Sequence, residues 1–287
     1  MAIDVSQRFI FDDTDIRGDI VSLSGCFKEI ITDNDYPPGV AALLGEFLVA
    51  SVLMSSTIKF EGRLVLQARG KGDLSLLMAE VTHDRQIRGI ARYKQDVSTP
   101  DMQTLFAGGA LAVTIEPANG ERYQSLVPIA GSKLSDCLEH YFEQSEQLST
   151  SITLASAHDA VSGLLLQQLP SQLVTDVTER ANQWQHVTVL TNTLTDEELI
   201  TLSGTDVLSR LFVEEQVRLL DENNIQFRCT CSTERTARAL VLIDSAELDA
   251  MFDETAVIEM NCEFCSKQYA FSRQTLTEVL EGERNIN

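Results

Sequence analysis

Residues 227–235 (FRCTCSTER) and residues 259–265 (EMNCEFC) hold four of the six cysteines of this 287-residue chain. The first pair is Cys229-Thr230-Cys231 and the second is Cys262-Glu263-Phe264-Cys265, with 30 residues between the two pairs. Two close pairs of thiolates on two turns are what a tetrahedral four-cysteine zinc site requires. The sequence therefore predicts that Cys229, Cys231, Cys262 and Cys265 bind one Zn²⁺ ion.

The region that contains these cysteines is short, and its apolar residues are few. Structural zinc in small domains contributes on the order of 10–16 kcal/mol of apparent binding free energy, more than so thin a core could lose and remain folded. The sequence therefore predicts a small C-terminal zinc module that unfolds without its metal.

The Cys-x-Cys spacing of the first pair also permits a second chemistry. Two thiolates separated by one residue chelate a metal or close a small disulfide, and Arg228, Arg235 and Arg238 nearby are expected to favour the thiolate form. Oxidation of either pair would remove zinc ligands and so unfold the module. From the spacing alone, such a switch and a purely structural zinc site both remain open.

Composition and charge narrow the class of protein. Apolar residues make up 44% and charged residues 23%, which is ordinary for a globular chain, and the formal charge is −21. Residues 1–178 carry 13 basic and 23 acidic side chains (−10), and residues 179–287 carry 9 and 20 (−11). This charge repels phosphate backbones and anionic lipids, so no nucleic-acid or membrane partner is expected.

The location is predicted from the same sequence. The most apolar stretch, Leu43 to Met54, is shorter than the roughly 20 residues needed to span a bilayer, and Met1 to Gln7 show no secretion signal. We therefore expect a protein of the reducing cytoplasm, where clustered cysteines favour metal binding or redox sensing over structural disulfides.

Periodicity along the chain predicts an α+β fold. Strands are expected within 16–31, a buried helix after Tyr36-Pro37-Pro38-Gly39, and hairpins at 64–81 and around Asn119-Gly120. From Lys133 the pattern reads as helical, with a further apolar stretch at 152–169. Strands followed by helices are typical of α+β domains.

The texture of the sequence changes after residue 178. Short, acidic, helical segments with narrow apolar faces follow, and Thr195 with Glu198 fits a capping box. We therefore predict an N-terminal mixed domain with hairpins and buried helices (1–178), a helical linker that detaches readily (179–227) and the zinc-binding module (228–287).

Other chemistry-bearing residues form no site. Cys26 and Cys137 have the surroundings of core cysteines, Gly70-x-Gly72 reads as a hairpin turn, and no serine or carboxylate motif for catalysis is present. The four histidines have no ligand spacing: His83, His140, His158 and His186. The alternatives to a zinc-thiolate switch are a zinc-ribbon binding module for nucleic acid and a thiol–disulfide oxidoreductase.

The sequence resembles the redox-regulated heat-shock proteins of about 33 kDa, a family of holdase chaperones. The resemblance rests on residues 227–235 and 259–265 together with Tyr269-Ala270-Phe271. It extends over most of the chain, including the segments at 36–38, 43–46, 120–124 and 141–147.

This resemblance implies a mechanism. In the family, the four matching cysteines bind zinc as thiolates in a reduced, inactive state. Peroxide with unfolding conditions, or hypochlorous acid, joins neighbouring cysteines, which here are Cys229 with Cys231 and Cys262 with Cys265. The zinc module and linker then unfold, and the exposed surfaces hold unfolding client proteins without ATP. Oxidised subunits also form homodimers. The resemblance thus implies a stress-response chaperone rather than an enzyme.

This chain departs from the family pattern at two turns. Ser266-Lys267 follows the last cysteine where glycine and asparagine are expected, and Ala256 stands where glycine is expected. Glycine eases tight turns, so these residues are expected to alter the local geometry of the module and the ease of its oxidation.

Overall fold

The computed structural model describes residues 4–32, 34–94, 97 and 101–284, which form a mixture of helices and antiparallel sheets. The chain divides into two compact units, Met1–Phe227 and Arg228–Asn287. The α+β class predicted from the sequence is confirmed.

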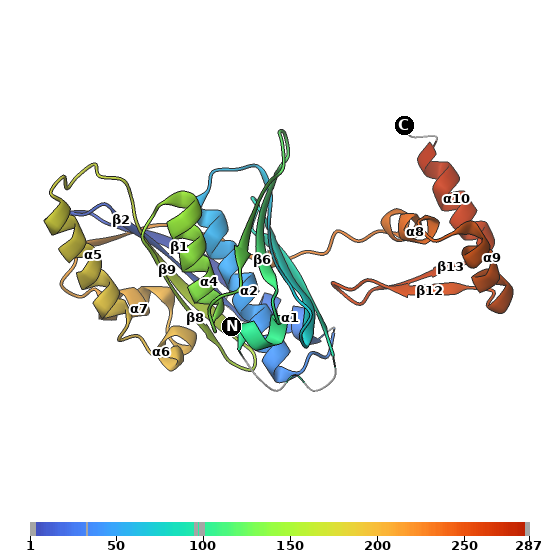
Figure 1. The fold of residues 1–287 in the computed structure, drawn as a ribbon, viewed down its shortest axis with the longest axis horizontal. Helices are drawn as coiled ribbons and strands as arrows, with labels where there is room; N and C mark the ends of the chain where they lie inside the picture. Colours follow the sequence, from blue (N-terminus) through green and yellow to red (C-terminus); the bar gives the residue numbers. More distant parts are fainter. Residues whose placement is uncertain (1–3, 33, 95–96, 98–100, 285–287) are drawn as a thin grey trace. The chain divides into compact units, whose positions relative to one another are not determined.

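Helix α2 (Pro38–Thr57) is the central helix of the first unit. Pro38 lies in its first turn, where its fixed φ suits a helix start, and 15 of its 20 residues are buried. The helix packs between a five-stranded and a six-stranded sheet (Figure 1). Of the helices described, α2 alone is long and apolar enough to cross a bilayer, but 83% of its most apolar window is buried. The predicted buried helix is therefore the spine of a protein core.

The five-stranded sheet has the order β10-β1-β2-β9-β8 and is antiparallel throughout. Its strands are β1 (Asp4–Phe11), β2 (Ile16–Leu23), β8 (Thr150–Ser156), β9 (Val161–Gln168) and β10 (Val217–Asn224). The helical interpretation of residues 152–169 is wrong, because this segment forms the β8–β9 hairpin. Strand β9 is buried on both faces, so its apolar residues do not alternate with polar ones as those of a half-buried strand do.

The six-stranded sheet has the order β11-β5-β4-β3-β6-β7 and covers the other side of α2. Both predicted hairpins are confirmed: β3 pairs with β4, and β6 pairs with β7 across a turn at Gly120, whose φ is +120°. The strands are β3 (Gly62–Arg69), β4 (Leu74–Thr82), β5 (Gln86–Tyr93), β6 (Ala110–Pro117), β7 (Tyr123–Pro128) and β11 (Gln226–Phe227).

Short helices complete this part of the unit. The segment 16–31, expected as strand, is strand only in its first half and then becomes α1. The helices are α1 (Gly25–Thr32), α3 (Met102–Phe106), α4 (Leu134–Tyr141) and the π-helical turn η1 (Phe142–Glu146).

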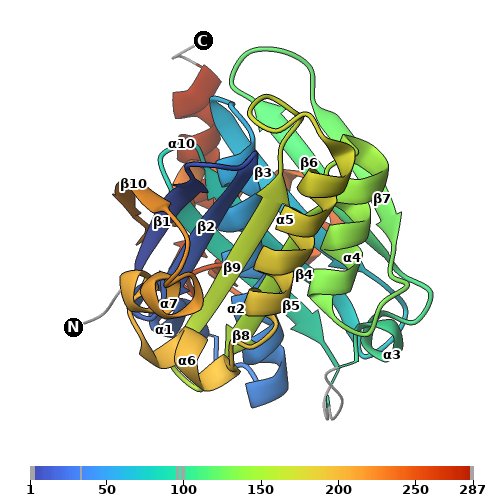
Figure 2. The ribbon, with the colours of Figure 1, turned by 90° about the vertical axis from the view of Figure 1, so that its left-hand side faces the viewer.

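Three capped helices cover the outer face of the five-stranded sheet: α5 (Val177–Thr191), α6 (Asp196–Thr201) and α7 (Gly204–Leu211). The predicted capping box is present, since Thr195 and Glu198 each accept a hydrogen bond from the other's backbone. Their apolar side chains pack on a sheet face that includes Phe9, Ile20 and Leu164 (Figure 2). The helices therefore form a separate layer with its own small hydrophobic cluster.

Strand β10 follows α7 and was not expected, because residues 179–227 read as helical. It pairs with β1, and β11 then pairs in parallel with β5 of the other sheet. Side chains that face water give β10 no apolar alternation, so backbone pairing rather than a hydrophobic pattern makes it a strand.

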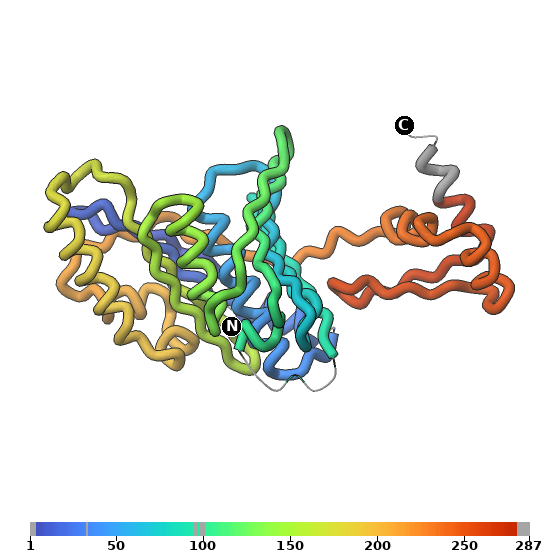
Figure 3. The backbone as a smooth tube through the Cα atoms, in the orientation of Figure 1, coloured from blue at the N-terminus to red at the C-terminus, as the bar shows by residue number. Residues whose placement is uncertain are grey.

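The second unit has a two-stranded sheet and three helices, which the backbone trace of Figure 3 shows in orange to red. They are α8 (Thr233–Val241), α9 (Ser245–Glu254), β12 (Ile258–Asn261), β13 (Gln268–Phe271) and α10 (Arg273–Arg284). Six side chains form its buried cluster: Ala237, Leu240, Ile258, Tyr269, Phe271 and Leu276. The core of this unit is thin, as the sequence predicted.

Candidate metal centre

Two turns of the second unit carry the four cysteines. Cys229 and Cys231 lie in the segment before α8, which starts where the Ser232 hydroxyl accepts a hydrogen bond from the Arg235 backbone. The Arg235 side chain donates to the carbonyl and the hydroxyl of Thr230, at 2.9 and 2.6 Å. These contacts fix the loop that presents the first cysteine pair.

The second pair lies in the turn between β12 and β13. The Cys262 backbone donates to the Lys267 carbonyl at 2.9 Å, and the Ser266 backbone donates to the Cys262 carbonyl at 2.8 Å. Ser266 has φ of +51°, a left-handed conformation that glycine adopts without steric cost. The serine at this position therefore strains the turn that holds Cys262 and Cys265, where glycine would not.

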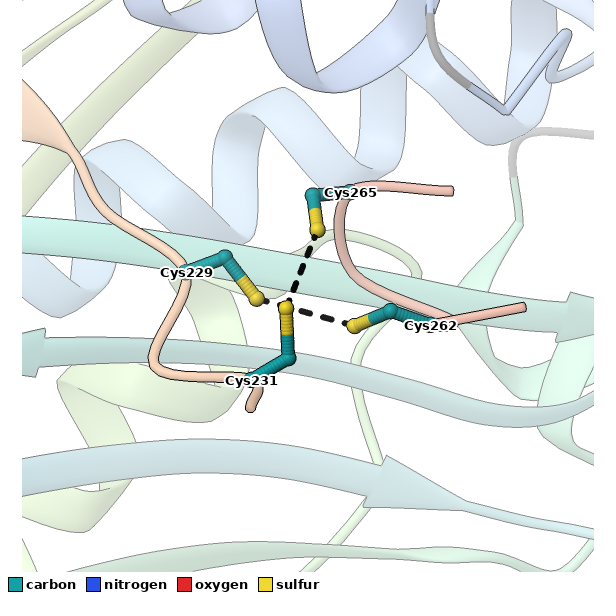
Figure 4. A group of neighbouring side chains, drawn as sticks. All are labelled: Cys229, Cys231, Cys262 and Cys265. Carbon is teal, nitrogen blue, oxygen red and sulfur yellow. Dashed lines mark hydrogen bonds between the residues drawn. The ribbon is translucent and has the colours of Figure 1, made fainter. Parts of the chain in front are cut away.

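The four sulfur atoms converge on one point (Figure 4). They all lie within 4.8 Å of one another, with 3.6 Å from Cys229 to Cys262 and 3.5 Å from Cys231 to Cys265. Four sulfurs bound to zinc at about 2.3 Å lie about 3.8 Å apart at the corners of a tetrahedron, whereas a disulfide bond is about 2.05 Å long. The spacing is that of ligands around a metal and not that of bonded sulfurs, and all six cysteines are free thiols.

Tyr269 of β13 is part of the surroundings of this cluster. Its hydroxyl donates to the Cys231 sulfur at 3.0 Å, and its ring is 6% exposed. Burial raises the pKa of Cys231, but hydrogen bonds from Tyr269 and from the neighbouring thiols outweigh this and lower it to about 7. The same hydrogen bond raises the pKa of Tyr269. Sequence reasoning assigned no role to this tyrosine, although its place four residues after the last cysteine was visible.

The other thiols of the cluster titrate in the opposite direction. Burial raises the pKa of Cys229 and that of Cys265, because a second thiolate beside the first is unfavourable. A divalent cation removes this conflict by stabilising all four thiolates together. The arginine effect expected from the sequence is different in kind, since Arg235 binds Thr230 and supports the loop.

The remaining candidates of the sequence lie elsewhere. Cys26 and Cys137 are buried in the first unit, at 6% and 2% exposure, as expected of core cysteines. Within the described part of the chain, the four-cysteine cluster is the single group of three or more potential metal-ligating side chains. The soft, tetrahedral donor set fits zinc, whose structural sites are closed by four such ligands.

Comparisons with known proteins agree in their result. The description of the Hsp33 protein family matches residues 4–272. The chain is 44% identical over 282 residues to a 33 kDa chaperonin of Ectopseudomonas mendocina, which covers 97% of this chain and 96% of the relative. A 33 kDa chaperonin of Pseudomonas aeruginosa is also 44% identical, covering 97% and 95%.

The fold has a match among solved structures. The crystal structure of a 33 kDa chaperonin, a heat shock protein 33 homologue from Thermotoga maritima, superposes with a TM-score of 0.82. The sequences are 21% identical, and the match covers 98% of this chain and 99% of the other. Both units described above therefore have counterparts in that fold.

Proposed function

This chain belongs to the Hsp33 family of chaperones, and we propose that it is a redox-regulated, ATP-independent holdase that binds unfolding proteins under oxidative stress. It is a chaperone and not an enzyme. The observation that supports the redox regulation is the cluster of four cysteine sulfurs within 4.8 Å of one another.

In the reduced state, the proposed ligands of one Zn²⁺ ion are Cys229, Cys231, Cys262 and Cys265. The bound ion supplies positive charge that keeps the thiolates ionised and ties the segment before α8 to the β12–β13 turn. Around it, the Tyr269 hydroxyl orients the Cys231 sulfur, and the Arg235 side chain holds the loop at Thr230. The chain's own contribution is thus to bring four ligands into register at two turns.

Oxidation would convert these ligands into two disulfides. A peroxide accepts two electrons from each pair of thiolates, forming a sulfur–sulfur bond while the peroxide is reduced to water. The resemblance pairs Cys229 with Cys231 and Cys262 with Cys265, although the shortest sulfur distances join the two segments. Bridges within one segment fit the proposal better, because they still close when the module unfolds, whereas bridges between the segments would hold the module together.

The proposed consequence is a change in the exposed surface. We assign residues 1–178 to the chaperone domain, 179–227 to a linker and 228–287 to the redox module. Unfolding of the module releases the linker from the sheet face that it covers, and this face becomes available to unfolding client proteins. Formation of homodimers on oxidation and a cytoplasmic location complete the proposal.

Other functions for the zinc module have less support. A nucleic-acid-binding zinc ribbon needs positive charge, but residues 179–287 carry 9 basic and 20 acidic side chains. A thiol–disulfide oxidoreductase needs a free nucleophilic thiolate, whereas four converging sulfurs favour a metal-bound state.

Metal analysis and disulfide mapping test the redox proposal. We expect one zinc per chain in the reduced protein, released on treatment with peroxide at elevated temperature, with the loss of four hydrogens per chain. Peptide mapping should locate the two bridges within 229–231 and 262–265. Zinc that stays bound after the cysteines have been oxidised would contradict the proposal.

Replacement of Tyr269 by Phe should weaken zinc binding. The change removes the hydrogen bond to Cys231 and keeps the buried ring, and loss of such an outer partner costs roughly 10- to 100-fold in metal affinity. Competition with a chromophoric chelator measures this affinity. Tyr123→Phe, at an exposed tyrosine of β7, is the control and should leave affinity unchanged. Equal affinities for both variants would remove Tyr269 from the site.

Replacement of Asp15 by Asn should loosen the linker. The Asp15 carboxylate accepts hydrogen bonds from the backbones of Gln172, Leu173 and Val174 and pairs with Arg180 of α5 at 2.6 Å. Breaking a buried ion pair costs about 3–5 kcal/mol. Urea titration followed by the fluorescence of Trp184, the one tryptophan of the chain, measures the docking of α5.

The control and the pH dependence sharpen this experiment. Asp12→Asn removes an exposed ion pair with Arg218, and such pairs are worth about 1 kcal/mol or less. Although burial opposes ionisation, the hydrogen bonds and Arg180 lower the pKa of Asp15. Its contribution is therefore present above the unfolded pKa of 3.8 and is lost as the pH falls through the lower, folded pKa. Equal effects of the two variants would show that Asp15 is not an anchor.

A further inference from the structure

Strand β10, the last strand before the second unit, is weakly held. None of its eight residues is buried, and six are exposed, including Leu219 at 41% and Leu220 at 43%. Four of the eight residues of its neighbour β1 are buried. The strand thus contributes little apolar burial to the sheet that it extends.

The contacts that hold β10 are mostly backbone contacts at one edge. It pairs only with β1, and the register shifts between Gln7 and Phe9. The Gln7 side chain donates to the Leu220 carbonyl, and the Arg218 ion pair with Asp12 is exposed on both sides. Backbone pairing of this kind does not depend on the side chains of β10, so another extended segment could form it equally well.

The surface beside this edge is strongly apolar. Phe9 and Phe11 of β1 are 0% and 3% exposed, and the ring of Phe212, at the end of α7, lies 4.9 Å from the ring of Phe11. Figure 2 shows β10 beside β1, with α7 over the same sheet. Residue 212 is only five positions before the start of β10, so release of α7 and release of β10 are linked through the chain.

We propose that β10 occupies the client site: when the linker detaches, an extended segment of an unfolding protein pairs with the vacated edge of β1 in its place. This inference rests on the proposed function and names its binding surface. Backbone hydrogen bonds to β1 would give affinity for many sequences, and alternate apolar side chains of the client would contact the face formed by Phe9, Phe11 and Ile20. The occupant is therefore an apolar, extended and uncharged or cationic segment, since the chain itself carries −21.

A disulfide lock between β1 and β10 tests the proposal on the full-length protein. Ile10 and Arg218 are directly paired across the two strands, so the double variant Ile10→Cys/Arg218→Cys can tie β10 in place. The matched control, Ile115→Cys/Tyr123→Cys, ties the edge strand β7 to β6. After oxidation, we expect both variants to release zinc, but only the lock at β10 to lose at least tenfold in suppression of client aggregation.

A crosslinking experiment gives an independent readout if the lock fails to form. A photoreactive phenylalanine analogue at Ile10 should crosslink within the chain in the reduced state and to a denatured client, such as thermally unfolded citrate synthase, after oxidation. The same analogue at Leu126, which is 67% exposed on β7, should give no client product.

The outcomes separate this inference from the proposed function. Full client protection by the locked protein, or client crosslinks from Leu126 in place of Ile10, would overturn the β1 edge as the client site. Crosslinks from Ile10 to a second copy of the chain would also overturn it, because β10 would then be exchanged between subunits. Failure of the unlocked, oxidised protein to release zinc or to protect clients would instead count against the redox-regulated function.

Discussion

Removal of zinc from the reduced protein should unfold the second unit and leave the first unit folded. The buried cluster of the second unit is small, and several of its large apolar side chains face water, including Val241 at 51% and Leu242 at 89% exposure. Zinc binding in small modules supplies on the order of 10–16 kcal/mol, so no other interaction in the unit replaces it. The effect is therefore an all-or-none loss of structure.

Hydrogen exchange detected by mass spectrometry measures this result. After chelation in a reducing buffer, amides of α8, β12 and β13 should exchange at the rate of an unfolded chain, and readdition of zinc should restore their protection. Amides of α2 and β4, which lie in the core of the first unit, provide the internal control. Protection of β12 and β13 that survives chelation would mean that the hydrophobic cluster alone holds the module.

The double variant Cys262→Ser/Cys265→Ser should abolish the dependence of client protection on oxidant. The change removes two of four proposed ligands, and the two remaining thiols cannot complete a tetrahedral site. The module is then unfolded in reduced and oxidised samples alike, so we expect both to protect a client equally. Wild-type protein should protect only after oxidation.

A buried cysteine provides the control for this variant. Cys137 is 2% exposed in α4 of the first unit, away from the sulfur cluster, so Cys137→Ala should keep the oxidant dependence of the wild type. Aggregation of a heat-unfolding client, followed by light scattering with and without peroxide treatment, compares the three proteins. If the double variant still responded to oxidant as the wild type does, Cys262 and Cys265 would have no part in the switch.

Local patterns in the sequence predicted several parts of the fold. The Pro37-Pro38 start and continuous apolar residues identified α2, and Asn119-Gly120 identified the β6–β7 hairpin. The four cysteines identified the cluster, because ligand spacing is a property of the local chain. In each case the signal lies within a few residues of the feature that it predicts.

The parts that were missed depend on tertiary contacts. Strand β9 is buried on both faces, so its continuous apolar run could not be told from a helix by periodicity. Strand β10 has no apolar pattern of its own and forms through pairing with β1, more than 200 residues earlier in the chain. The contact of Tyr269 with Cys231 and that of Asp15 with Arg180 likewise join residues far apart in sequence.

The turn at Ser266 shows how the resemblance and the structure complement each other. The sequence showed serine where glycine is expected, and the structure gives this residue a φ of +51°. A left-handed non-glycine residue costs roughly 1–2 kcal/mol. The strain lies in the segment that carries Cys262 and Cys265, where it favours opening of the turn once the thiolates are oxidised.

Light scattering of a heat-unfolding client, without ATP, tests the redox-gated chaperone most directly. The reduced, zinc-loaded protein and the same preparation after peroxide at elevated temperature are compared at equal concentration. The account predicts that only the oxidised sample suppresses aggregation. Equal behaviour of the two samples would contradict it and would leave the four-cysteine cluster as a structural metal site.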